Sequence, residues 1–110
     1  MKSLEEINAE HEVDKLDAFL ELTPYQQLTL VAWCDDNLQK IKSINRKHTS
    51  YGLKHRFEYS SGGFYVTNGA FKKAMLEAGF DYIPGRSASK NWCFNVSEKS
   101  IKLLMKKEHH

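Results

Sequence analysis

The sequence has few of the residues and motifs that several specialised protein classes require. Two cysteines, Cys34 and Cys93, are too few for a disulfide scaffold. No apolar run approaches the roughly 18 residues that a membrane span needs, and the acidic start at residues 1–6 does not resemble a secretory signal. Cys-x-x-Cys and His-x-x-x-His spacings are missing, and no glycine-rich loop continues into Gly-Lys-Ser or Gly-Lys-Thr. We therefore expect a cytoplasmic protein that uses no membrane, metal or cofactor.

Residues suited to catalysis are also scarce. A nucleophilic cysteine needs a general base beside it, and the candidates are His48 and His55. Cys34 lies in an apolar helical pattern, and nothing in the sequence places a histidine near Cys93. We predict that the protein is not an enzyme.

Charge is plentiful but unevenly divided along the chain. The 110 residues, enough for one domain, carry a formal net charge of +2. Residues 1–40 contain three lysines and nine acidic residues, a net charge of −6, whereas residues 41–110 contain 13 lysines and arginines and five acidic residues, a net charge of +8. A basic region with interleaved aromatic residues is typical of proteins that bind polyanions. Alternatively, the acidic part folds back onto the basic part and neutralises it.

Two helices are predicted in the acidic part. The first covers residues 1–22, where a capping-box pattern precedes apolar residues at near-helical spacing. The second begins at Thr23 and Pro24, because proline suits the first helical position, and its apolar stripe continues to Ile41. We expect an acidic N-terminal helix at 1–22 and a separate domain at 23–110.

The basic part is predicted to contain three more helices and a β-hairpin. Apolar residues at helical spacing, ended by glycines, indicate the helices, and alternating aromatic and polar residues around a turn-rich loop indicate the hairpin. The expected elements are a helix over 50–59, an extended run over 64–66, a helix over 69–78, a hairpin over 80–96 and a helix from Ser97 to Lys107.

This order of elements resembles a winged helix-turn-helix, in which a recognition helix is followed by a β-hairpin wing. The resemblance implies a mostly α-helical single domain with a small β-hairpin and an N-terminal helical extension. The segment 60–66 departs from the pattern, because it is longer than the usual turn of about 3–4 residues. The residues that would face nucleic acid are Asn68, Lys72 and Lys73 on the recognition helix and Arg86 and Lys90 at the tip of the wing.

Three segments carry a second resemblance: Tyr51–Phe57, Phe64–Met75 and Asn91–Asn95. They look like parts of small proteins from Gram-positive mobile genetic elements, such as phages, integrative elements and staphylococcal cassette chromosomes. In the cassettes, a small protein acts as the partner of the element's own DNA polymerase and contacts single-stranded DNA. The resemblance implies a replication accessory role rather than sequence-specific repression.

Basic residues beside aromatic ones form the candidate binding site. Proteins that bind single strands combine a cationic track with flat side chains on which bases stack. Lysines 47, 54 and 72 equally fit ordinary solvated side chains. The stacking candidates are Tyr51, Tyr59, Tyr65 and Tyr82, whereas Phe57, Phe64, Phe71, Trp92 and Phe94 are expected in the core. The predicted nucleic-acid-binding residues are Arg46, Lys47, Lys54, Arg56, Tyr65, Asn68, Lys72, Lys73, Arg86 and Lys90.

These patterns together predict a non-catalytic, nucleic-acid-binding accessory protein of a mobile element. It would aid replication by binding DNA, single-stranded DNA above all, together with a polymerase or helicase partner. Two alternatives stay open from the sequence. The protein could be an adapter or inhibitor that docks on another protein through its acidic helices, or a dimeric transcriptional regulator.

Overall fold

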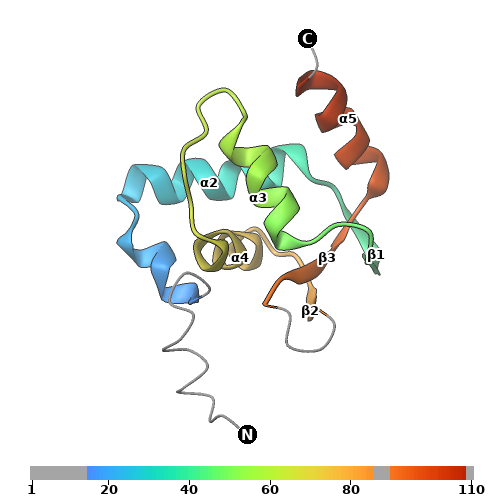
Figure 1. Cartoon of the computed structure of the whole chain (residues 1–110), viewed down its shortest axis with the longest axis horizontal. Coiled ribbons are helices and arrows are strands. Elements are labelled where there is room, and N and C mark those ends of the chain that lie inside the picture. Colours follow the sequence, from blue (N-terminus) through green and yellow to red (C-terminus); the bar gives the residue numbers. More distant parts are fainter. Residues whose placement is uncertain (1–14, 86–89, 109–110) are drawn as a thin grey trace, which may run out of the picture.

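A computed structural model describes residues 15–85 and 90–108. As predicted, this part of the chain is mostly helical with a β-hairpin, and a third strand completes a small antiparallel sheet (Figure 1). No helix in the described ranges is both long and apolar enough to cross a membrane. The elements are η2 (Leu16–Glu21), α2 (Pro24–Asn37), β1 (Lys40–Asn45), α3 (Ser50–Glu58), α4 (Asn68–Glu77), β2 (Tyr82–Pro84), β3 (Trp92–Val96) and α5 (Glu98–Glu108).

The acidic part of the chain contains two helices of different type. Residues 1–14 of the predicted N-terminal helix lie outside the described residues, and its described end is the 3₁₀ helix η2 rather than an α-helix. α2 begins as predicted. The Thr23 hydroxyl accepts the Gln26 N–H at 3.1 Å, and the Gln26 side-chain oxygen accepts the Thr23 N–H at 3.0 Å, which completes a capping box.

β1 is a strand that the hydrophobic spacing does not predict. The helix expected to reach Ile41 ends at Asn37, because the chain becomes extended at Leu38 (φ −115°, ψ 126°). The following residues pair with β3 instead. The Asn95 amide of β3 reinforces this pairing by donating to the Ile41 carbonyl at 2.9 Å. Pairing with a strand about 50 residues away along the chain therefore decides the local structure, which is a common way for tertiary context to override local preference.

β3 is the central strand of the sheet, whose order is β1-β3-β2. The predicted hairpin is confirmed, with Tyr82 opposite Phe94 and Pro84 opposite Trp92. The predicted extended run over 64–66 does not join the sheet. It belongs to the loop that connects α3 to α4.

α4 is the central helix of the domain, and η2, α2 and α3 pack around it. Seven of its ten residues are buried. Thr67 caps its start, and Gly79, with φ +92°, ends it as predicted. Trp33 of α2 meets the edges of two core rings, Phe57 at 5.4 Å and Phe71 at 6.4 Å between centroids. The predicted core aromatic residues are confirmed as buried or packed against the core: Phe57, Phe64, Phe71, Trp92 and Phe94.

Candidate nucleic-acid interface

Three of the predicted binding residues face the interior rather than the solvent. Lys54 is 7% exposed, Asn68 7% and Lys72 3%. The Lys54 ammonium lies 3.0 Å from a carboxylate oxygen of Glu58, and the Lys72 ammonium lies 4.8 Å from the centre of the Trp92 ring. We therefore leave these three residues out of the candidate interface.

The burial of α4 also changes its expected role as a recognition helix. Of the three groove-facing residues predicted on it, only Lys73 is partly exposed, and its ammonium pairs with Glu77 at 2.9 Å. Asn68 instead donates from its amide to Asn91, at 3.0 Å. The described part of α4 thus offers little free polar surface for reading bases in a groove.

The remaining predicted residues fall in separate places. Arg46 and Lys47 are exposed in the turn after β1, and Tyr65 is exposed in the loop between α3 and α4. Arg56 and Lys90 are partly exposed. Arg86, at the predicted tip of the wing, lies outside the described residues.

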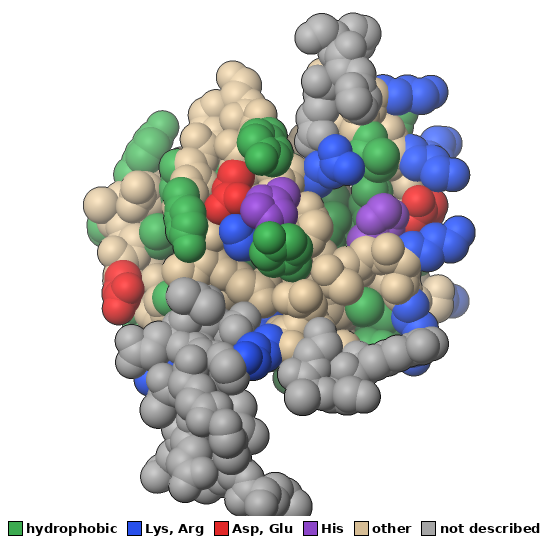
Figure 2. Space-filling model, viewed as in Figure 1, with side chains coloured by type: hydrophobic (Ala, Val, Ile, Leu, Met, Phe, Trp, Pro, Cys, Tyr) green, Lys and Arg blue, Asp and Glu red, His purple; other side chains and the backbone are tan. Residues whose placement is uncertain are grey.

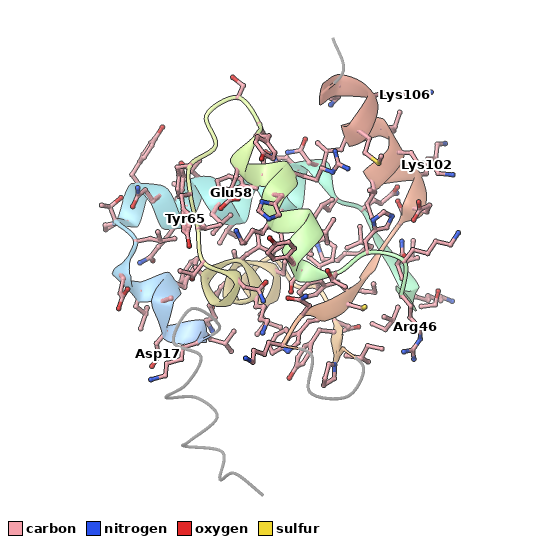
Figure 3. The ribbon with its side chains drawn as sticks, in the orientation of Figure 1. Asp17, Arg46, Glu58, Tyr65, Lys102 and Lys106 are labelled. Carbon is pink, nitrogen blue, oxygen red and sulfur yellow. The ribbon has the colours of Figure 1, made fainter. Side chains whose placement is uncertain are left out.

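α5 carries exposed positive charges that are not among the predicted binding residues. Lysines 99, 102 and 106 follow each other in α5 at spacings of three and four, so they share one face of the helix. Figure 3 shows Lys102 and Lys106 along α5 and Arg46 near the end of β1, on the same side of the molecule. We define the cationic edge as Arg46, Lys47, Lys99, Lys102 and Lys106, all of them exposed.

No described carboxylate forms an ion pair with any member of the cationic edge. Lys40, by contrast, lies 3.4 Å from Asp35, which compensates part of its charge. Figure 2 shows the corresponding band of Lys and Arg side chains over α5 and the end of β1. The edge is therefore a region of concentrated positive charge that can attract a polyanion.

Glu98 joins the two parts of the cationic edge. Its carboxylate, in the first turn of α5, accepts a hydrogen bond from the Asn45 amide at 3.0 Å and lies 2.9 Å from the His48 ring Nε2. These bonds from Asn45 and His48 lower the pKa of Glu98 below its ordinary value, and the charge of nearby Lys47 adds to the effect. Glu98 thus fixes the turn after β1 against the start of α5.

A cluster of exposed rings lies next to this edge. Tyr51, His55 and Tyr59 are spaced by four residues and so share one face of α3 and its C-terminal cap. The Tyr51 ring meets the His55 ring edge-on at 4.4 Å, and the His55 and Tyr59 rings lie nearly parallel at 6.3 Å. Tyr65 lies on the loop that follows α3 (Figure 3), and the Lys54 ammonium is near both its ring and that of Tyr51. We call Tyr51, His55, Tyr59 and Tyr65 the aromatic patch.

Buried polar contacts hold the aromatic patch in place. The Glu58 carboxylate receives the Lys54 ammonium at 3.0 Å, the Val66 N–H at 3.0 Å and the His55 Nδ1 at 2.9 Å. Burial acts to raise the pKa of Glu58, but the Val66 N–H and the Lys54 ammonium outweigh it and lower that pKa below its ordinary value. Because Val66 follows Tyr65, Glu58 anchors the α3–α4 loop to α3.

The cysteine and histidine side chains that were considered for catalysis have other surroundings in the described structure. Cys34 is fully buried, and burial raises the pKa of its thiol, which disfavours the reactive thiolate. His48 and His55 lie against the carboxylates of Glu98 and Glu58, each at 2.9 Å. Across the described residues, no three His, Cys, Asp or Glu side chains come together as metal ligands.

No family model, curated protein or solved structure matches this chain. The cationic edge and the aromatic patch are therefore interpreted from their own geometry. The missed signal in the sequence was the spacing of the lysines at 99, 102 and 106, which places them on one helical face.

Proposed function

We propose that the protein is a non-catalytic nucleic-acid-binding protein that holds the phosphate backbone on its cationic edge. One observation carries the proposal: five exposed lysine and arginine side chains lie together without a described carboxylate partner. Cations arranged in this way release the counterions condensed on a nucleic acid, and this release supplies most of the affinity of non-specific binding.

The arrangement of the elements supports a winged-helix-like fold as the scaffold for this function. The α3–α4 pair is followed by the β2–β3 hairpin, which is the order of a helix-turn-helix with a wing. Because α4 is largely buried, we propose contact through the phosphate backbone rather than base reading by α4. The resemblance to mobile-element proteins extends the proposal to a cytoplasmic replication accessory role beside a polymerase or helicase.

Binding measurements with paired variants test the role of the edge. Lys102→Gln/Lys106→Gln removes two exposed cations, whereas the matched control, Lys40→Gln/Lys73→Gln, removes two lysines that already pair with carboxylates. We expect the first variant to lower the slope of log K against log[salt] by about 1.4 on a single strand, since each lost phosphate contact removes about 0.7. The control should leave the slope within about 0.5 of the original.

Fluorescence anisotropy with labelled single-stranded and duplex DNA provides these slopes. The proposal would be overturned if the native chain bound neither form of DNA at low salt. It would also be overturned if the two double variants lost affinity equally, because the edge would then have no special part in binding.

A second candidate function rests on the acidic part of the chain. Residues 16–39 contain four acidic residues and no lysine, arginine or histidine. Leu20, Tyr25 and Leu28 are largely exposed there, on η2 and α2. An acidic and apolar surface of this kind suits an adapter that docks on a basic protein. Loss of partner binding, without loss of DNA binding, in Leu20→Ser/Leu28→Ser would favour this function.

A further inference from the structure

We propose that the aromatic patch is a subsite on which unpaired nucleobases stack, so that the preferred ligand is a single strand. This inference rests on the proposed function, because the cationic edge would hold the phosphates of the same strand. The residues of the subsite are Tyr51, His55, Tyr59 and Tyr65, and an open hollow beside the first three offers a place for a base.

The exposure of these rings is the first argument. Tyr51 is 52% exposed, Tyr59 80% and Tyr65 68%, in a domain whose other large aromatic side chains mostly serve the core. Tyr82, the remaining stacking candidate, already lies parallel to Trp92 at 3.9 Å, so one of its faces is covered. Tyr51 and Tyr59 both lie beside His55, yet each of the three tyrosines keeps more than half of its surface exposed. Exposed rings gathered in one place indicate a binding site.

The shape of the patch is the second argument. An open hollow of about 560 Å³ is lined by Tyr51, Gly52, His55, Arg56 and Tyr59. A Cβ atom at Gly52 would meet nothing within 4 Å, so the absent side chain leaves this part of the hollow empty. A flat ring can therefore approach Tyr51 and Tyr59 over the backbone of Gly52.

Preorganisation is the third argument. Tyr51 and His55 are fixed on α3, and Tyr65 precedes the residue whose N–H is held by Glu58 at 3.0 Å. The Lys54 ammonium contacts two rings of the patch, at 5.6 Å from the centre of the Tyr51 ring and 5.2 Å from the centre of the Tyr65 ring. Rings that are already placed lose little entropy when a ligand binds, which favours affinity.

The chemistry around the rings points to nucleobases rather than to an apolar partner. The patch contains no exposed aliphatic side chain, and Arg56 lines its hollow. The turn that carries Arg46 and Lys47 ends two residues before α3, so the chain joins the cationic edge to the helix that carries Tyr51 and His55. Proteins that bind single strands combine these two features, and base faces become accessible to protein rings only where the bases are unstacked from a duplex.

Tyrosine variants of the full chain test the inference. Tyr59→Ala and Tyr65→Ala remove one ring each, Tyr59→Phe and Tyr65→Phe keep it, and Tyr25→Ala removes an equally exposed ring from α2 as a matched control. The probes are a labelled oligothymidylate of about 20 nucleotides and a duplex of the same length, lengths that suit single-strand sites of about 4–16 nucleotides.

We expect each alanine variant to bind oligothymidylate at least about fivefold more weakly, since one stacked base contributes about 1–3 kcal/mol. The phenylalanine variants and Tyr25→Ala should stay within about twofold, because stacking needs the ring and not the hydroxyl. The slope against salt should be unchanged in all five variants, because no phosphate contact is removed. Affinity for the duplex should also be unchanged, and the thermal unfolding midpoint should confirm that each variant folds.

Two results would overturn the inference and leave the proposed function intact. The first is oligothymidylate binding by both alanine variants with the affinity of the native chain. The second is an equal loss of affinity for oligothymidylate and duplex. Failure of the native chain to bind either probe would instead overturn the proposed function, and the inference with it.

Discussion

At the scale of single residues, Glu58 connects more of the candidate interface than its sequence position suggests. Its carboxylate is the partner of the buried Lys54 ammonium and of the Val66 N–H. Glu58→Gln keeps the size of the side chain and an oxygen for Val66, but it leaves Lys54 buried without an opposite charge. We expect it to lower the free energy of unfolding by about 2–3 kcal/mol at neutral pH, as measured by urea denaturation.

The loss of stability caused by Glu58→Gln should depend on pH. Because the pKa of Glu58 is lowered in the folded protein from its ordinary value of 4.5, ionised Glu58 stabilises the fold above that ordinary value. This stabilisation is lost as the pH falls through the folded pKa. The difference in unfolding free energy between the native chain and Glu58→Gln should therefore shrink as the pH falls below 4.5.

Glu77→Gln is the control, because Glu77 is half-exposed and pairs with Lys73 on the surface. It should change the free energy of unfolding by less than about 0.5 kcal/mol. A difference for Glu58→Gln that grew on acidification would contradict the assignment of a stabilising carboxylate at this position.

Lys54 and Lys72 show what the sequence can reveal about single residues and what it cannot. The spacing of Lys54 and Glu58 is that of a helical ion pair, so their pairing is visible in the sequence. Their burial is not, because it depends on the α3–α4 loop that crosses this face of α3. In the same way, Lys72 is covered by Trp92, which lies on a strand 20 residues further along.

At the scale of elements, replacing either of two glycines in and after α3 by alanine should change the free energy of unfolding, in opposite directions at the two positions. Gly52 lies within α3 without a positive φ, and an added Cβ would meet nothing within 4 Å. Gly52→Ala should therefore raise the free energy of unfolding by about 0.5–1 kcal/mol, since alanine favours helix and restricts the unfolded chain. At Gly63, an added Cβ would collide with the Phe57 carbonyl oxygen, so Gly63→Ala should destabilise the fold.

Urea denaturation of the two variants beside the native chain measures both effects. Matched m-values would show that the change lies in stability rather than in the compactness of either state. Stabilisation by Gly63→Ala would contradict the close approach of the α3–α4 loop to the end of α3.

The elements that can be predicted from the sequence are those whose ends are marked by nearby residues. Thr23, Thr67 and Gly79 mark helix ends through side-chain caps or a left-handed backbone, and each acts within a few residues. β1 has no such signal, since its apolar residues fit the end of a helix as well as a strand, and only pairing with β3 distinguishes the two. The cationic edge also depends on tertiary structure, because Glu98 brings the turn after β1 to α5.

At the scale of the whole molecule, the acidic helix η2 and the basic helix α5 lie far apart. Figure 1 shows η2 and α5 toward opposite sides of a molecule whose longest dimension is 45 Å. Asp17 lies at the η2 side and Lys102 at the α5 side (Figure 3). In the described structure, the exposed acids of η2 therefore do not neutralise the cationic edge by direct contact.

This separation predicts a salt-dependent effect of Asp17→Asn/Glu21→Gln on nucleic-acid binding. Both side chains are exposed on η2, so removing their charges should strengthen binding only through long-range electrostatics. At about 0.01 M salt the Debye length is about 30 Å, and binding should tighten equally for single-stranded and duplex DNA. At about 0.15 M salt the Debye length is about 8 Å, and the gain in binding affinity should disappear. Anisotropy titrations at the two salt concentrations measure this, and an equal gain at both would mean that η2 lies against the nucleic acid.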